Sequence, residues 1–162
     1  EFPDFLEGFE PLKHVGYLPD VARLELGMRR CYHAGDATPI DPTIFSTLPP
    51  EQLAKTQAIF APAMQLIRSP WPILDIWHFN MTEGAPQPSG TAQDVLIGRA
   101  EFDPEMHVLA PGGYDLIKLL SGGQPLGNAL ETVEKNHPEF DFSTLLGVLL
   151  QTGALISLDL NN

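Results

Sequence analysis

The sequence predicts an α+β protein with a helical first subdomain and a small winged-helix-like second subdomain that contains a β-hairpin. Three observations lead to this prediction. Apolar residues recur at helical spacing between residues 19 and 34, two short apolar runs flank Asp103-Pro104, and three helix-like segments follow them. Apolar residues make up 43% of the 162 residues, which is enough for a packed core in one domain or two small ones.

The clearest helix of the first half is predicted over residues 19–34. Pro19 suits the first helical position, where its missing N–H costs nothing, and Gly35 is a typical residue to end a helix. The segment before this helix is apolar, and we expect it to pack on the rest of the protein as a lid. Its residues 4–9 are compatible with one helical turn. The face of the 19–34 helix that should be buried carries Val21, Leu24, Met28, Cys31 and Tyr32.

The middle of the chain is less regular and rich in proline. Residues 57–68 alternate in part like a strand, and Pro62 favours an edge position for it. A short buried helix is predicted over residues 72–79. The glycines and prolines that follow predict a linker over residues 82–93, so we place a domain boundary there, between residues 1–81 and residues 94–162.

The second half gives clearer patterns. Two strands, one over residues 94–100 and one over residues 106–109, are predicted to form the β-hairpin. Asp141 is suited to cap the last helix, and Gly153 to end it. The three predicted helices and the closing strand cover residues 113–121, 125–135, 142–152 and 154–158. This order of elements is typical of a compact winged-helix-like unit.

Charge and cysteine content narrow the possible functions. The formal net charge of −12 disfavours binding to nucleic acid and to anionic membranes, and suits a partner with a basic face. No apolar run approaches the roughly 20 residues that cross a bilayer. The single cysteine, Cys31, excludes an internal disulfide bond, so we expect a reducing, cytoplasmic location.

The sequence predicts no catalytic, cofactor or metal site. No two of the histidines are three or four residues apart, and no Cys-x-x-Cys pair occurs: the histidines are His14, His33, His78, His107 and His137. Cys31 lies on the apolar face of a predicted helix, which favours a buried structural thiol over a nucleophile. No Gly-x-Ser-x-Gly turn occurs. We therefore expect a protein that is not an enzyme.

Several blocks of the sequence resemble a known bacterial family. The most specific reads Tyr-Leu-Pro-Asp-Val-Ala-Arg-Leu-Glu over residues 17–25, followed by Tyr-His-Ala over residues 32–34. The later blocks cover residues 69–77, 94–99 and 140–155. Together they resemble the HvfC/BufC family, whose usual label is a DNA-binding domain. Two features depart from its pattern: Leu26 stands where an aromatic residue is expected, and the helical segment that usually precedes the first block is missing.

The resemblance implies two competing roles. In one, the protein is a non-catalytic partner of a multinuclear iron oxidase that modifies cysteines of a ribosomally made peptide. It would bind the enzyme and help present the peptide, which a winged-helix-like domain can accept as an added strand. In the other, it is a DNA-binding transcriptional regulator. We favour the first role and expect two partners, the iron oxidase and its peptide.

The charges of the second half weigh against DNA binding. From Asp94 onward, three basic residues (Arg99, Lys118 and Lys135) stand against ten acidic ones, and the last predicted helix carries no basic residue. DNA contacts are expected only from the missing N-terminal segment. The candidate partner-binding residues combine two arginines of the first helix, the aromatic cluster and the hairpin: Arg23, Arg30, Trp71, Trp77, Phe79, Val95, Ile97 and Arg99. For the aromatic cluster, a place in the core is an equally good interpretation.

Overall fold

The computed structural model describes residues 2–160 and confirms an α+β fold. Its first-half elements are α1 (Phe2–Gly8), a 3-10 helix (Glu10–Leu12), α2 (Leu18–His33), α3 (Ile44–Thr47), α4 (Pro50–Leu53), β1 (Thr56–Phe60), β2 (Gln65–Ser69) and α5 (Ile73–Met81). The remaining elements are β3 (Gln93–Gly98), β4 (Glu105–Val108), α6 (Gly113–Ser121), α7 (Leu126–Asn136), α8 (Phe142–Gln151) and β5 (Leu155–Leu160). No helix within these residues is long and apolar enough to cross a membrane.

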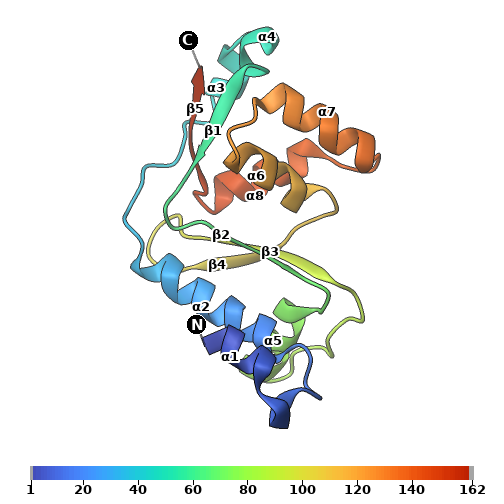
Figure 1. Cartoon of the computed structure of the whole chain (residues 1–162). Helices are drawn as coiled ribbons and strands as arrows, with labels where there is room; N and C mark the ends of the chain where they lie inside the picture. The colour runs from blue at the N-terminus through green and yellow to red at the C-terminus, as the bar shows by residue number, and fades with distance from the viewer. Residues whose placement is uncertain (1, 161–162) are drawn as a thin grey trace.

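An antiparallel sheet of three strands, in the order β2–β3–β4, lies in the middle of the molecule. Figure 1 shows α1, α2 and α5 on one side of this sheet, which we call the N-terminal layer, and α6, α7 and α8 on the other side, the C-terminal layer. A second, two-stranded antiparallel sheet pairs β1 with β5 and packs against α6 and α7.

The central strand β3 is buried on both faces because each layer covers one of them. Val95 and Ile97 pack in the core of the N-terminal layer with Leu24 and Ile73. Leu96, which points to the opposite face, packs in the core of the C-terminal layer. A strand covered on both sides is typically a continuous apolar run, and β3 has this pattern.

The strand pairing joins the two domains that were predicted on either side of residues 82–93. This segment has no helix or strand before Gln93, as a linker should. Both sheets, however, draw strands from its two sides, since β2 pairs with β3 and β1 pairs with β5. The closing strand therefore adds to β1 rather than to the hairpin, and the two halves of the chain share their sheets.

Most local predictions are confirmed. The helices predicted over residues 19–34, 113–121, 125–135 and 142–152 form as α2, α6, α7 and α8. The Asp141 side chain accepts a hydrogen bond from the Ser143 N–H at 2.9 Å and so caps α8. The single strand predicted over residues 57–68 is wrong. A turn at residues 61–64 divides it into β1 and β2, because Pro62 lacks the N–H that a continuous ladder needs.

Candidate protein-binding surface

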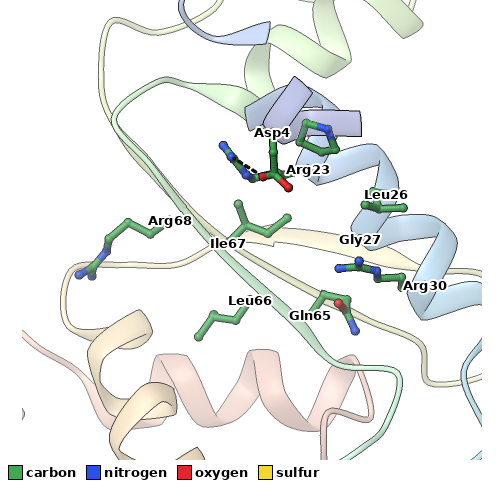
Figure 2. A pocket seen from close by; sticks show the side chains of 10 residues that line it. Asp4, Arg23, Leu26, Gly27, Arg30, Gln65, Leu66, Ile67 and Arg68 are labelled. Carbon is green, nitrogen blue, oxygen red and sulfur yellow. Dashed lines mark hydrogen bonds and ion pairs between the residues drawn. The ribbon is translucent and has the colours of Figure 1, made fainter. Parts of the chain in front are cut away.

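A groove runs along the outer edge of β2, between this strand and the N-terminal layer. It has a volume of about 300 Å³. Figure 2 shows Gln65, Leu66 and Ile67 along the strand. Ile67 points toward α2, which carries Leu26 and Arg30, whereas the Leu66 side chain points to the opposite side, toward the C-terminal layer. Pro3, Asp4, Arg23, Gly27 and Arg68 complete the lining. Structure thus brings Arg23 and Arg30, two of the predicted partner-binding residues, to the same groove.

The edge of β2 that lines this groove has unpaired backbone groups. Leu109 N–H donates to Asp94 C=O at 2.8 Å, so the backbone groups of residues 94, 96 and 98 face β4. The backbone groups of residues 93, 95 and 97 then face β2. The backbone groups of their partners on β2, residues 69, 67 and 65, face β3. The N–H and C=O groups of Leu66 and Arg68 therefore point outward. Within residues 2–160 they form no backbone hydrogen bond beyond the sheet.

Close packing of α2 on the sheet sets the width of the groove. Gly27 lies where α2 meets the strands, and a Cβ at this position would come within 2.9 Å of Ile97 Cδ1 and 3.3 Å of Ile67 Cδ1. The absence of a side chain allows this close approach. Arg23 and Arg30 lie on either side of Gly27, at helical spacings of four and three residues, and consequently both reach the same groove.

Arg23 is already engaged by acidic side chains. Its guanidinium forms ion pairs with Asp20 at 2.6 Å, with Asp4 at 3.5 Å and with Glu7. The hydrogen bond to Glu7 contributes most to raising the Arg23 pKa, and the bond to Asp20 adds to it. Asp4 and Glu7 belong to α1, so Arg23 fastens α1 to α2. Arg30 also lines the groove, and its side chain is exposed.

Arg68 connects the sheet to the C-terminal layer. Its guanidinium binds both carboxylate oxygens of Asp94 at 2.9 Å, pairs with Asp115 at 3.0 Å and lies 4.0 Å from the centre of the Tyr114 ring. His137 Nε2 lies 3.0 Å from the other oxygen of Asp115. The hydrogen bond to Asp94 contributes most to raising the Arg68 pKa. Because these partners already satisfy its guanidinium, Arg68 acts mainly as a structural link.

The aromatic cluster divides between surface and core. Trp71 is 41% exposed and Phe79 is 47% exposed, and both line a hollow of about 530 Å³ with Tyr17 and three prolines. The rings of Tyr17 and Trp71 meet edge to face at a centroid distance of 6.3 Å. Trp77 instead packs against the core of the N-terminal layer. The structure thus places Trp77 at the core and Trp71 and Phe79 at the surface, and their role in an interface stays a prediction.

Val95 and Ile97 are not surface residues, which corrects their place among the predicted contacts. Both are fully buried, because α2 and α5 cover the face of β3 on which they lie. Arg99, which follows β3, is largely buried as well: Nη2 donates to Ala34 C=O at 2.7 Å and pairs with Asp36 at 3.1 Å. No local pattern marks Leu66 as a residue whose backbone groups point outward, because the edge of a sheet is decided by which strands pair.

The other edge of the sheet, formed by β4, differs in charge. By the same alternation, Met106 and Val108 present their backbone groups outward. Glu105 lies on this strand, and Glu101 and Asp103 precede it in the exposed turn. This edge is therefore acidic, whereas three arginines and one carboxylate line the groove at β2.

Neither a metal-ligand cluster nor an exposed thiol is found among residues 2–160. No group of three or more histidine, cysteine, aspartate or glutamate side chains is arranged to hold a metal ion. Cys31 is fully buried, and this burial raises the pKa of its thiol, an effect that the charge of Arg99 opposes. His137, whose Nε2 lies 3.0 Å from Asp115, lines a hollow of about 580 Å³ together with Ser69, whose hydroxyl donates to Asp20 at 2.6 Å.

Comparisons with known proteins do not identify a relative. No protein-family model matches the chain, no curated protein matches it, and no solved structure matches its fold. The resemblance to the HvfC/BufC family and the winged-helix comparison therefore stay predictions.

Proposed function

We propose that this protein is a non-catalytic partner of a peptide-modifying iron oxidase, and that it holds the peptide as a fourth strand at the edge of β2. The observation that carries this proposal is the open edge of β2 on a groove walled by α2. A peptide in extended conformation gains main-chain hydrogen bonds at such an edge, and pockets beside it select side chains.

The outward groups of Leu66 and Arg68 supply two N–H donors and two C=O acceptors to an added strand. Leu26 and Ile67 give the groove an apolar wall and floor, while Arg30 places an exposed cation at one side. An incoming strand with an acidic side chain facing α2 would meet this cation. The acidic β4 edge would repel the same side chain, so we assign the peptide to β2.

The identity of the enzyme partner rests on the family resemblance of residues 17–25 and of the later blocks. The hollow with Trp71 and Phe79 supports a protein partner in a second way, because exposed aromatic side chains are enriched at protein interfaces. DNA binding has less support. The exposed side of α8 carries no basic residue, and the net charge is −12.

The experiment that tests the proposal measures two associations. The genes that flank the gene of this protein are searched for an iron oxidase and a short cysteine-rich peptide, and the absence of both would count against the proposal. Where they are present, their products are mixed with the protein, and complexes are followed by light scattering after gel filtration. Binding of the fluorescently labelled peptide is followed by anisotropy. We expect association with both. Failure to associate in either order of mixing, or salt-sensitive binding to duplex DNA instead, would overturn the proposal.

A proline substitution tests the added strand itself. Leu66→Pro removes one outward N–H and leaves the hydrogen bonds between β2 and β3 in place, because that N–H does not take part in them. We expect peptide affinity to fall by at least about tenfold, from the lost donor and the blocked edge. Leu66→Ala controls for the lost side chain, and Val108→Pro makes the matched change at the β4 edge. Equal losses in Leu66→Pro and Val108→Pro would contradict the assignment to β2.

A further inference from the structure

A second site surrounds Arg99, away from the β2 groove. Arg99 follows β3, and only 11% of its side chain is exposed. Nη2 is well partnered, since it contacts both Ala34 C=O and Asp36 Oδ1. Nε is different: it is buried and has no hydrogen-bond partner among residues 2–160. A buried donor on a charged group without an acceptor is unfavourable, so this guanidinium is incompletely satisfied within its own chain.

The contact between Arg99 and Asp36 uses only part of the guanidinium. Nε and Nη2 lie on the same edge of its planar fork, and a carboxylate that bridges both donors makes the strongest pairing. Asp36 reaches Nη2 alone, and its side chain is 93% exposed. Water competes for so exposed a carboxylate, which makes Asp36 a partner that another carboxylate can replace.

The space beside Arg99 is small and formed by small residues. Its volume is about 150 Å³. Besides Arg99, Asp36 and Glu101, its lining consists of glycine and alanine: Gly35, Ala37, Ala61, Ala63, Ala100 and Gly153. Gly153 has a φ of +62°, and a Cβ there would come within 3.0 Å of Ala100 Cα, so this wall of the space has no room for a larger residue.

We propose that the Arg99 pocket binds one carboxylate of a protein or peptide ligand, which bridges Nε and Nη2 in place of Asp36. The orphan Nε donor points to an anion with two oxygens, and the small lining residues leave room for its short aliphatic stem. Asp36 and Glu101 line the same pocket and would repel a second negative charge, so a carboxylate is favoured over a doubly charged phosphate. This site does not depend on peptide binding at β2.

The test uses the whole chain and three small probes at constant ionic strength. N-acetylglutamate N-methylamide carries a side-chain carboxylate, N-acetylglycylalanine carries a chain-terminal carboxylate, and N-acetylglutamine N-methylamide is neutral. Binding is read from the NMR signal of the Arg99 Nε–H group. We expect a saturable shift with a carboxylate probe and at least tenfold weaker binding of the neutral one. The stronger of the two carboxylate probes identifies the source of the group.

Two variants keep the proposal falsifiable even if replacement of Arg99 prevents folding. Asp36→Asn removes the competing carboxylate and is expected to tighten binding of the carboxylate probe severalfold. Asp103→Asn, which removes an exposed carboxylate outside the pocket lining, should leave the affinity unchanged. Equal shifts with the neutral and charged probes, no shift with any probe, or no gain in Asp36→Asn over Asp103→Asn would each overturn the proposal.

Discussion

The two helical layers that sandwich the β2–β3–β4 sheet bury the same central strand by different means (Figure 1). The C-terminal layer relies on a large apolar core that includes Leu116, Ile117 and Leu149. The N-terminal layer has a smaller core, a close approach of α2 at Gly27 and a buried polar link. In that link, Gln93 of β3 accepts from the Leu74 N–H of α5 at 2.9 Å and donates to Asp75 at 2.8 Å.

This difference shows how one strand can couple two unlike layers. The apolar contacts of the C-terminal layer are numerous, and such contacts are not directional. The N-terminal layer depends on fewer contacts with more specific geometry. The groove at β2 that we propose as the peptide-binding site lies beside this second kind of layer, and Arg23 and Arg30 line it.

The largest expected effect on stability comes from removing a buried side chain from either core. Leu24→Ala in α2 and Leu116→Ala in α6 each remove a side chain that is fully buried, and each should lower the free energy of unfolding by about 3 kcal/mol. Because both layers share β3, we expect each variant to unfold in a single transition in urea, followed by far-UV circular dichroism and tryptophan fluorescence. Separate unfolding transitions by circular dichroism and by fluorescence would contradict the prediction that the two layers unfold as one unit.

Two glycine substitutions compare a helix that packs closely on the sheet with a helix position that has open space beside it. Both Gly27 in α2 and Gly147 in α8 lie inside helices, where alanine is intrinsically favoured by about 0.5–1 kcal/mol. A Cβ at Gly147 meets nothing within 4 Å, so Gly147→Ala should stabilise the protein by that amount. At Gly27 the Cβ meets Ile97 and Ile67, so Gly27→Ala should destabilise it by about 1 kcal/mol.

Thermal and urea unfolding of the two glycine variants provide the measurement, and the wild-type chain provides the reference. Equal stabilisation by both substitutions would show that α2 can move away from the sheet at little cost. The width of the β2 groove would then be adjustable, and the contrast between the two layers would lose its physical basis.

The sequence predicts the helices well because their signals are local. The periodicity of α2 and the cap at Asp141 each depend on residues within a few turns of each other. The pairing of β1 with β5 joins residues about a hundred positions apart, and no local pattern encodes such a pairing. The predicted division at residues 82–93 therefore followed composition, whereas the strands pair across it.

The candidate site was predicted in part, for similar reasons. Arg23 and Arg30 share a helix face by spacing alone, so their convergence could be foreseen. Val95 and Ile97 were predicted as contacts because the hairpin offers an edge to an added strand, but they lie on β3, which is the central strand of the sheet. The continuous run from Val95 to Ile97 indicates burial on both faces and is the signal that could have prevented the error. The buried state of Arg99 depends on the α2 terminus, which is distant in sequence.

The smallest expected effect concerns one carboxylate in each layer. Partial burial is the largest influence on the pKa of Asp115 and raises it, but Arg68 and then His137 outweigh burial, so the pKa is lowered. The pKa of Asp75 is also lowered, first by its hydrogen bond with Ser89 and then by Gln93. In each case the native state favours the ionised form. The stabilisation is therefore present above the unfolded pKa of about 3.9 and is lost as the pH falls through the lower native value.

Asp115→Asn and Asp75→Asn should thus each reduce the loss of stability that occurs as the pH falls below about 4, by less than about 1 kcal/mol for these partly exposed groups. The contributions of the two carboxylates to stability should differ in their dependence on salt. Asp115 is stabilised by charges, so its contribution should shrink between 0.05 M and 1 M sodium chloride, while that of Asp75, held mainly by neutral donors, should change little. Urea unfolding across this pH range, with Asp103→Asn as the control for net charge, measures both. An equal response of both carboxylates to salt would contradict the expected difference, in which charged groups stabilise Asp115 and neutral hydrogen-bond donors stabilise Asp75.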